Sequence, residues 1–380
     1  MKMHSLLSLI LLLPAVLCAG SKPSPRSEVR AIWVTRYDYK SPTDVSSIIV
    51  NCAQAGFTDI FFQIRGNGTA FYPSRVEPWA FELSGKDVSA TGTDPGWDPL
   101  QMAANWAKRY HVRLHAYINV LPGWRGFAEP PRAAGQLWTA HPDWFMVDST
   151  GARMKPTSAW YSFLNPAHPQ VRTHLSQIAA ELARYELAGL HLDYIRFPYD
   201  YKDVAREVYR NASVKQIKAH SSFSFDPVSL GKMGRSASRK KWDAFRRASV
   251  SQIVEDLRRV FKARNPNAIL SSSVLADFAT GYHTAFQDSR HWAKTGAVDW
   301  LVPMNYNASL FDERLSKMKH VLGRRSTGRQ LVVGINCAGD AGEIRRQIEV
   351  SRRAGCRGVA LFAYSHLFEN HQPTAKSRLF

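Results

Sequence analysis

The residue best suited to chemistry in this sequence is Asp193, which closes a short apolar run and precedes Arg196 by three positions. Alternation along a strand predicts that His191, Asp193 and Ile195 share one face, opposite Tyr194. A carboxylate at the carboxyl end of a barrel strand points toward the mouth, where it can act as an acid or a base. The alternative is a structural Asp that pairs with Arg196 and only closes the barrel mouth.

Glycoside hydrolysis usually needs a second carboxylate near the first. Asp277 and Asp38 follow other predicted strands and are the leading choices for this catalytic partner, with Asp340 behind them. Asp299 lies near the start of a strand and is expected to be structural. Neither the fourth nor the seventh strand ends in Glu, so the common pair of glutamates is not visible. We find no ligand set for zinc or another metal, and we expect no cofactor.

Polar and aromatic side chains close almost every predicted strand. Sugars need such a mixture, because planar polar groups bind hydroxyls and aromatic rings cover the apolar side of a pyranose. The candidate substrate-binding residues are Arg36, Gln63, Arg65, Asn119, Trp124, Arg196, Asn305, Tyr306, Asn336 and Tyr364.

The elements that position these residues alternate between apolar strands and helical segments. Near-continuous apolar runs are typical of parallel strands that are covered on both faces. Eight strands are predicted at Val29–Thr35, Thr58–Arg65, Val112–Val120, Gly189–Tyr194, Ala268–Asp277, Val298–Tyr306, Gln330–Cys337 and Gly358–Tyr364. Helices are predicted at Thr43–Ala55, Pro99–Tyr110, Pro169–Glu186, Lys241–Arg264, Phe311–Leu322 and Ala341–Ala354, with further candidates at Asn211–Ala219 and Tyr282–Lys294. This order predicts an α/β fold, a closed (β/α)8 TIM barrel.

Three connections are much longer than the others, at 66–97, 121–168 and 195–240. They follow strands two, three and four, so they belong to the βα loops, which form the catalytic face of a barrel. Long loops of this kind usually carry function.

The N-terminus has the layout of a secretion signal. Lys2 precedes an apolar run that ends at Pro14, and the small residues Ala19 and Gly20 follow. We therefore expect a signal peptide at 1–20, a polar linker at 21–28 and one barrel domain at 29–380, in a secreted or periplasmic protein. Cys18 raises a lipoprotein alternative. No later stretch is long and apolar enough to span a bilayer.

The chain of 380 residues has a formal net charge of +19. The charge predicts either a solvated basic surface or attraction to an acidic partner such as an anionic cell-wall polymer. The basic residues are scattered along the sequence, and no nucleic-acid motif is present, so we expect no nucleic-acid partner. The three cysteines beyond the signal cannot all pair within one chain and are expected to be core residues.

The motifs resemble those of glycosyl-hydrolase-like family ten. The run Gly189-Leu190-His191-Leu192-Asp193-Tyr194-Ile195-Arg196-Phe197-Pro198 carries the strongest similarity. Further similar stretches lie, in order, at 29–36, 61–68, 71–74, 97–100, 115–119, 164–166 and 298–306. The resemblance implies a barrel glycosidase of bacterial cell envelopes, and some relatives are similar to enzymes that cut peptidoglycan strands stripped of stem peptides. Asp193 matches the acid of the fourth strand. Many relatives have Asp at the positions of Tyr194 and Ala188, so substrate and mechanism stay open.

Three functions follow from these patterns. The first is an exported glycosidase of a polysaccharide, either a cell-wall or another amino-sugar glycan, with Asp193 as its acid/base. The second is a sugar-binding barrel without catalysis, which the departures at Tyr194 and Ala188 motivate. The third is a hydrolase of another anionic polymer, which the positive charge motivates. The sequence indicates neither linkage, stereochemical outcome nor oligomeric state.

Overall fold

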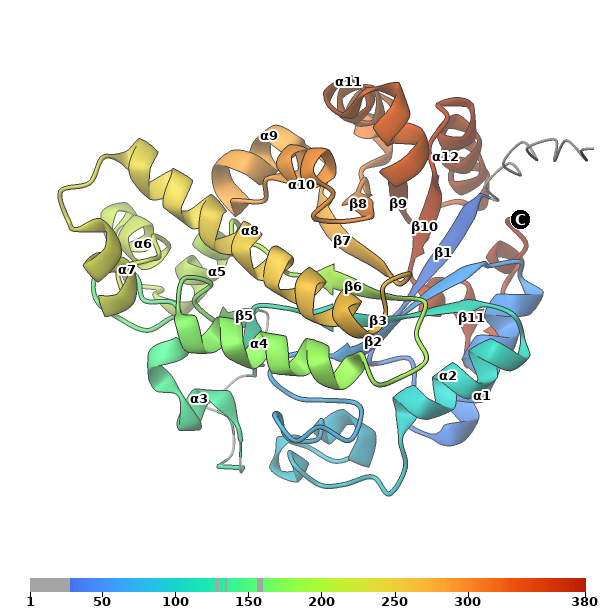
Figure 1. Cartoon of the computed structure of the whole chain (residues 1–380), viewed down its shortest axis with the longest axis horizontal. Coiled ribbons are helices and arrows are strands. Elements are labelled where there is room, and N and C mark those ends of the chain that lie inside the picture. Colours follow the sequence, from blue (N-terminus) through green and yellow to red (C-terminus); the bar gives the residue numbers. More distant parts are fainter. Residues whose placement is uncertain (1–27, 127–129, 131, 134, 156–159) are drawn as a thin grey trace, which may run out of the picture.

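In the computed structural model, eight parallel strands close into a barrel with helices around it (Figure 1). The structure describes residues 28–126, 130, 132–133, 135–155 and 160–380. The predicted signal peptide, Cys18 and nearly all of the linker lie outside the described residues. No helix within the described ranges is long and apolar enough to cross a membrane.

All eight predicted strands are present in the predicted order, each within about two residues of its predicted bounds. They are β1 (Val29–Val34), β2 (Asp59–Arg65), β3 (Arg113–Asn119), β6 (Gly189–Asp193), β7 (Ile269–Leu275), β8 (Trp300–Met304), β9 (Val332–Asn336) and β10 (Gly358–Phe362). Each strand pairs in parallel with its neighbours, and β1 pairs with β10 to close the ring. The TIM-barrel prediction is confirmed.

The six predicted main helices are also present. They are α1 (Pro42–Gln54), α2 (Pro99–Arg109), α4 (Pro169–Leu182), α8 (Arg239–Arg264), α11 (Phe311–Gln330) and α12 (Ala341–Arg353). The start of α1 follows from its sequence, because Ser41 and Asp44 form a capping box and Pro42 occupies the first turn. Within α11, Gly323 leaves the helical conformation, directly after the predicted end at Leu322.

The segment predicted as one helix at Tyr282–Lys294 is instead divided. A short α9 (Phe278–Thr280) runs into a π-turn at 281–285, and α10 (Ser289–Thr295) follows after a break. The break coincides with Phe286, whose positive φ of 55° interrupts the helix.

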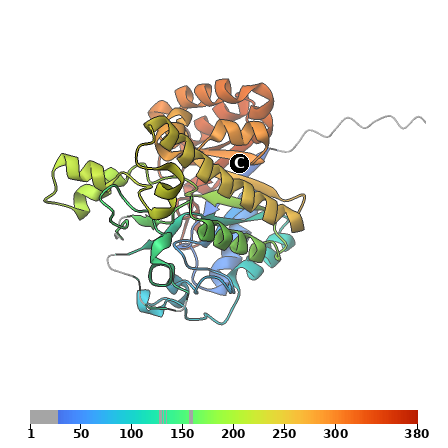
Figure 2. The same ribbon diagram turned by 60° about the vertical axis from the view of Figure 1, so that its left-hand side comes forward.

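The long loops contain short elements, most of which the sequence did not predict. The loop after β3 carries α3 (Leu137–Ala140) and a small hairpin of β4 (Pro122–Arg125) and β5 (Tyr161–Phe163). The loop after β6 carries α5 (Tyr201–Val208), α6 (Val214–His220) and α7 (Pro227–Met233). Of these, α6 confirms the helix candidate at Asn211–Ala219. The turned view shows the short helices α5 and α6 projecting to one side of the body (Figure 2).

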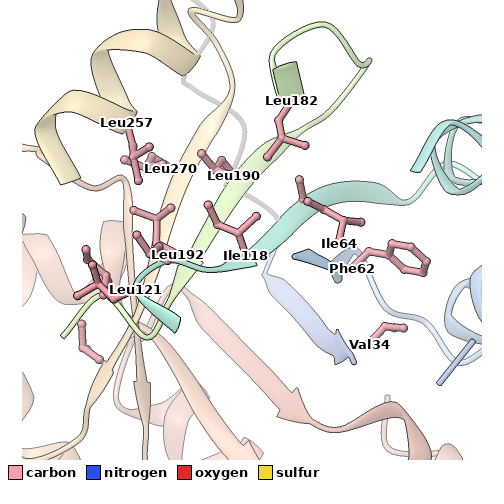
Figure 3. Close-up of a cluster of buried hydrophobic side chains, with 14 of the residues drawn as sticks. Val34, Phe62, Ile64, Ile118, Leu121, Leu182, Leu190, Leu192, Leu257 and Leu270 are labelled. Carbon is pink, nitrogen blue, oxygen red and sulfur yellow. The ribbon is translucent and has the colours of Figure 1, made fainter. Parts of the chain in front are cut away.

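Two apolar layers hold the barrel together. The outer layer lies between the strands and the helices, and Figure 3 shows Leu190 and Leu192 of β6 there, near Ile118 of β3 and Leu257 of α8. The inner layer fills the barrel with larger residues, including Trp33 and Phe61 on which the His191 ring stacks at 4.0 Å. A filled interior confines any cavity to the ends of the barrel.

All three cysteines beyond the signal are free thiols. Cys52 and Cys337 are buried, and Cys356 is half-buried. This agrees with the expectation that they serve as core residues.

Candidate active site

Asp193 lies at the mouth of the barrel and is held by three hydrogen bonds. Its Oδ1 accepts from the guanidinium of Arg196 at 3.0 Å and from the backbone N–H of Tyr194 at 2.7 Å. Its Oδ2 accepts from the Tyr117 hydroxyl at 3.0 Å. The carboxyl group is therefore fixed in orientation, with both oxygens engaged, although the side chain retains 10% exposure.

The chain turns sharply directly after Asp193. Tyr194 has a φ of 49°, in the left-handed region that non-glycine residues seldom adopt. This ends the alternation of the strand. Tyr194 and Arg196 both face the cavity at the mouth, whereas Ile195 packs into the outer core. The prediction that Ile195 shares the face of Asp193 is wrong, because β6 ends one residue before the turn.

A cavity of about 310 Å³ surrounds Asp193. This volume is at the small end of the range typical of small-molecule sites. Asp193 is the one carboxylate among the described residues that line it. The other lining residues are mostly aromatic or hydrogen-bonding side chains: Trp33, Thr35, Arg36, Tyr37, Gln63, Tyr117, Asn119, Arg125, Tyr161, Tyr194, Arg196, Met304, Tyr306 and Phe362.

The phenols beside Asp193 are held in their neutral form. Burial, and then the nearby carboxylate, raise the pKa of Tyr117 well above its ordinary value, and the same two causes raise that of Tyr306. Both hydroxyls therefore keep their protons at neutral pH and can donate hydrogen bonds. Burial alone would lower the pKa of Arg196, but the Asp193 carboxylate reverses the effect, so Arg196 remains a cation.

Strand register brings the polar lining residues together. Asn119 of β3 lies directly across from Asp193, and Gln63 of β2 lies across from Tyr117. The side-chain Oε1 of Gln63 accepts from the backbone N–H of Arg36 at 3.0 Å. The Asn119 amide donates to the Gly66 carbonyl at 3.0 Å, and its Oδ1 has no partner among the described residues.

The β4–β5 hairpin contributes Tyr161 to the cavity wall. The Tyr161 hydroxyl accepts from the Arg36 guanidinium at 3.2 Å. Arg36 also contacts Glu82 at 3.2 Å and the hydroxyl of Tyr37. Residues of the loops after β2 and β3 thus hold the Arg36 guanidinium, which follows β1, in place.

Five of the ten predicted substrate-binding residues line this cavity with Asp193. They are Arg36, Gln63, Asn119, Arg196 and Tyr306. The other five have different partners in the described structure.

Arg65 is turned away from the barrel interior by a bulge. The β2–β3 register skips a residue between Gln63 and Arg65, so Arg65 pairs with the outward-facing Ile118 instead of an inward residue. Its guanidinium is fully buried against the carboxylate of Glu77 at 2.6 Å. It also donates to the carbonyl of Val120 at 3.1 Å, so Arg65 organises the loops beneath the cavity.

Trp124, Asn305, Asn336 and Tyr364 are likewise engaged outside the cavity lining. Trp124 is buried in the β4–β5 hairpin. The Asn305 amide donates to the Phe311 carbonyl at 3.0 Å, and the Asn336 side chain accepts from Ala338 at 2.9 Å. The Tyr364 hydroxyl bonds to Asn51 at 2.9 Å. Each residue stabilises a turn or a packing contact.

The candidate partner carboxylates are not among the described residues that line the cavity. Asp38 accepts hydrogen bonds from the backbone and hydroxyl of Thr35, at 2.6 and 2.9 Å, and burial raises its pKa. Asp277 caps α9 and accepts from the N–H groups of Ala279 and Thr280. Burial would raise the pKa of Asp277, but these amides outweigh it and lower the pKa. Asp340 caps α12.

Several lining residues were absent from the predicted set. Trp33 and Phe362 point inward from β1 and β10, and inward alternation along those strands could have identified them. Tyr37 follows β1 at the rim and is 56% exposed. Tyr161 could not have been found from the sequence, because it lies deep in a long loop whose hairpin has no clear periodicity.

The chain is similar to two curated bacterial proteins. It is 24% identical over 319 residues to glycosyl hydrolase YngK of Bacillus subtilis, a match that covers 75% of this chain and 56% of YngK. It is 23% identical over 339 residues to glycosyl hydrolase DigH of Escherichia coli, a match that covers 76% of this chain and 69% of DigH. The chain therefore spans little more than half the length of YngK.

Solved structures with the same fold are also glycosidase barrels. The catalytic domain of β-amylase from Paenibacillus polymyxa superimposes with a TM-score of 0.59 at 10% identity, over 93% of this chain and 98% of that chain. The β-galactosidase Gan42B from G. stearothermophilus superimposes with a TM-score of 0.56 at 11% identity, over 90% and 52%. At these identities the likeness shows the fold alone. The model of the Glycosyl hydrolase-like 10 family, however, matches residues 28–337, and the chain belongs to this family.

Proposed function

We propose that this protein is an exported glycoside hydrolase that cleaves a polysaccharide, with a cell-wall or other amino-sugar glycan as its substrate class. The observation that carries the proposal is a fixed carboxylate, Asp193, in an aromatic and polar cavity at the mouth of a barrel. Family membership and the predicted signal peptide agree with this proposal. Asp193 would serve as the acid/base that protonates the leaving oxygen or activates water.

The remaining lining residues would bind the sugar. Arg36, Gln63, Asn119 and Arg196 offer hydrogen-bonding groups for hydroxyls, and Tyr306 offers an aromatic face. Asn119 supports this role most directly, because its Oδ1 is buried and lacks a partner among the described residues. A sugar hydroxyl would satisfy it.

The second carboxylate is the open part of the mechanism. Asp38 or Asp277 could serve only if its loop rearranged on substrate binding, because each now caps a turn or helix. Asp340, the third candidate, likewise caps a helix, α12. A panel of Asp38→Asn, Asp277→Asn and Asp340→Asn variants tests all three.

The test is incubation with peptidoglycan strands stripped of stem peptides, followed by mass analysis of the products. We expect saccharide products with the wild type and at least about 100-fold less with Asp193→Asn, the range typical of a lost acid/base. Asp87→Asn is a matched control at an exposed cap of a short 3-10 helix. Full activity of Asp193→Asn would refute the assignment.

A non-catalytic sugar-binding barrel is the second candidate. It is favoured by the single carboxylate among the described lining residues and by Tyr194 at a position where many relatives have Asp. It predicts binding of the same strands without any product, measured by calorimetry beside the cleavage assay. One cleaved product that depends on Asp193 would exclude it.

A further inference from the structure

A second cleft opens at the end of the barrel opposite Asp193. Its volume is about 1050 Å³. It is bounded by the first residues of strands, such as Ile269 and Trp300, and by the last turns of α8, α10 and α11. Because these strand starts and helix ends all lie at the αβ face, the cleft is separate from the cavity at the mouth.

This cleft has a strong excess of positive charge. Eight basic side chains line it: Arg113, Arg258, Lys262, Arg290, Lys294, Arg325, Arg329 and Arg357. Asp299 is the sole carboxylate among its described lining residues. Asp299 is already paired with Lys262 at 2.7 Å and Arg258 at 3.2 Å. Arg113 pairs with Asp59 at 2.6 Å. Residues that are scattered in the sequence thus converge on one hollow.

Four of these cations are exposed and have no acidic partner within ion-pair distance among the described residues. They are Arg290 and Lys294 of α10, and Arg325 and Arg329 of α11. At the ends of two other helices, a basic residue is paired with an acid. Arg352 at the end of α12 pairs with Glu28 at 2.7 Å, and Lys108 at the end of α2 pairs with Glu186 at 3.0 Å.

The helix dipole favours cations in the last turn of each helix. It acts on every helix separately, however, and does not account for unpaired cations that share one concave surface. Like charges that line the same cleft repel one another, and a bound anion would reduce that repulsion. The pattern is that of an anion-binding cleft.

We propose that this cleft binds a flexible linear polyanion with repeated phosphate groups. Arginine forks match phosphate oxygens in pairs, and six of the eight basic side chains are Arg (all but Lys262 and Lys294). The volume far exceeds one phosphate, so a chain that contacts several cations fits better than a single ion. The concave shape also suits a chain better than a flat bilayer.

The residues that line the cleft also argue against nucleic acid as its ligand. Single-stranded nucleic acids bind through bases stacked on aromatic rings as well as through phosphates. Trp300 is the one aromatic residue among the described lining residues, and it is buried. The cleft therefore offers charge without a stacking surface.

The experiment measures binding of fluorescently labelled long-chain inorganic polyphosphate to the full chain, by anisotropy at increasing salt. The cleft variant is Lys294→Glu with Arg325→Glu. Its matched control is Arg235→Glu with Lys240→Glu, which changes the net charge equally at exposed residues before and at the start of α8, remote from the cleft. Thermal melting verifies folding, and the neutralising pair Lys294→Gln with Arg325→Gln serves as a second variant.

We expect the cleft variant to lose affinity by about tenfold or more and to reduce the salt slope by about two, whereas the control stays within about twofold. Equal losses in both variants would show that net charge alone is responsible and would overturn the proposal. Equal affinity for inorganic monophosphate, or tighter binding to phosphatidylglycerol vesicles or to single-stranded DNA, would also overturn it. Glycan cleavage should be unchanged in the cleft variant, so this proposal and the proposed function can fail independently.

Discussion

The two ends of this barrel use the same residue types for different purposes. Each end contains a fully buried carboxylate bound by an Arg and a His: Glu77 with Arg65 and His174 near the mouth, and Asp59 with Arg113 and His115 at the base. Beyond these trios the ends diverge. At the mouth, Arg36 and Arg196 are paired with acids around an aromatic cavity, whereas the base leaves four exposed cations unpaired among the described residues.

This difference suggests that the mouth recognises a ligand by directed hydrogen bonds and the base recognises one by charge. A cavity in which Arg36 and Arg196 are paired with acids and the phenols stay protonated suits a hydroxyl-rich ligand, since it offers directed hydrogen bonds. An unpaired basic hollow instead exerts a field that depends on salt. The net charge of +19 alone could not distinguish these two environments.

The largest expected effect is on stability, at the base. In Asp59→Asn the carboxylate that bonds Arg113 at 2.6 Å and His115 at 2.9 Å is lost, in a side chain with no exposed surface. Breaking a buried ion pair typically costs about 3–5 kcal/mol. Urea unfolding should show this loss, while Asp299→Asn, at a partly exposed carboxylate, should lose about 1 kcal/mol or less. Equal losses would contradict the structural role of Asp59.

The second effect concerns acid stability near the mouth. Burial would raise the pKa of Glu77, but Arg65 and His174 outweigh it and lower the pKa from 4.5 to about 2. Because the folded-state pKa is depressed, this group stabilises the fold above about pH 4.5, and the contribution is lost as the pH falls through about 2. The full contribution is about 3 kcal/mol. The unfolding free energy should decline over this window.

Glu77→Gln isolates that contribution from the one made by Asp59, whose pKa is lowered in the same direction. The variant should be less stable at neutral pH and should show a shallower decline between pH 4.5 and 2. An unchanged slope would show that Glu77 is not the group that titrates.

The third prediction tests how Asp193 is held. Tyr117→Phe removes the donor to Oδ2 and leaves the two donors to Oδ1 in place. A lost hydrogen bond of about 1.4 kcal/mol corresponds to about tenfold. We expect kcat on the cleaved glycan to fall by about that factor with KM nearly unchanged. A rise in KM alone would instead make Tyr117 a sugar-binding residue.

The smallest effect is expected at the rim. Tyr37→Ala removes a half-exposed ring from the cavity edge, and loss of about 1 kcal/mol of stacking corresponds to about a fivefold rise in KM. The kcat should not change, because Tyr37 does not contact Asp193. Tyr199→Ala, an exposed tyrosine outside the lining, is the control. Equal effects of both substitutions would remove Tyr37 from the site.

The barrel could be predicted from sequence because its signals are local. Each strand is a continuous apolar run, and α1 begins with a capping box that is legible at Ser41 and Asp44. The prediction that His191 and Asp193 share one face of β6 is also confirmed, since Leu190 and Leu192 face the helices on the other side.

The site was harder to predict because its geometry depends on exceptions to regular alternation. The bulge after Gln63 turns Arg65 outward. The left-handed conformation of Tyr194 ends the alternation of the strand, so Asp193 and Ile195 do not share a face. The hairpin that delivers Tyr161 arises from long-range pairing within a loop. The basic cleft depends on residues from several strands and helices, between Arg113 and Arg357, which the closed barrel brings to one end.

Both ends of the described chain lie at the base of the barrel. Glu28 pairs with Arg352 beside the start of β1, and the Phe380 ring packs against Phe57 and beneath the Arg30 guanidinium. Attachment to a sensor surface beside Glu28 or Phe380 would therefore orient the molecule, with Asp193 directed to the solution and the basic hollow toward the support. Glycan binding should survive such immobilisation, and polyphosphate binding should be obstructed by it.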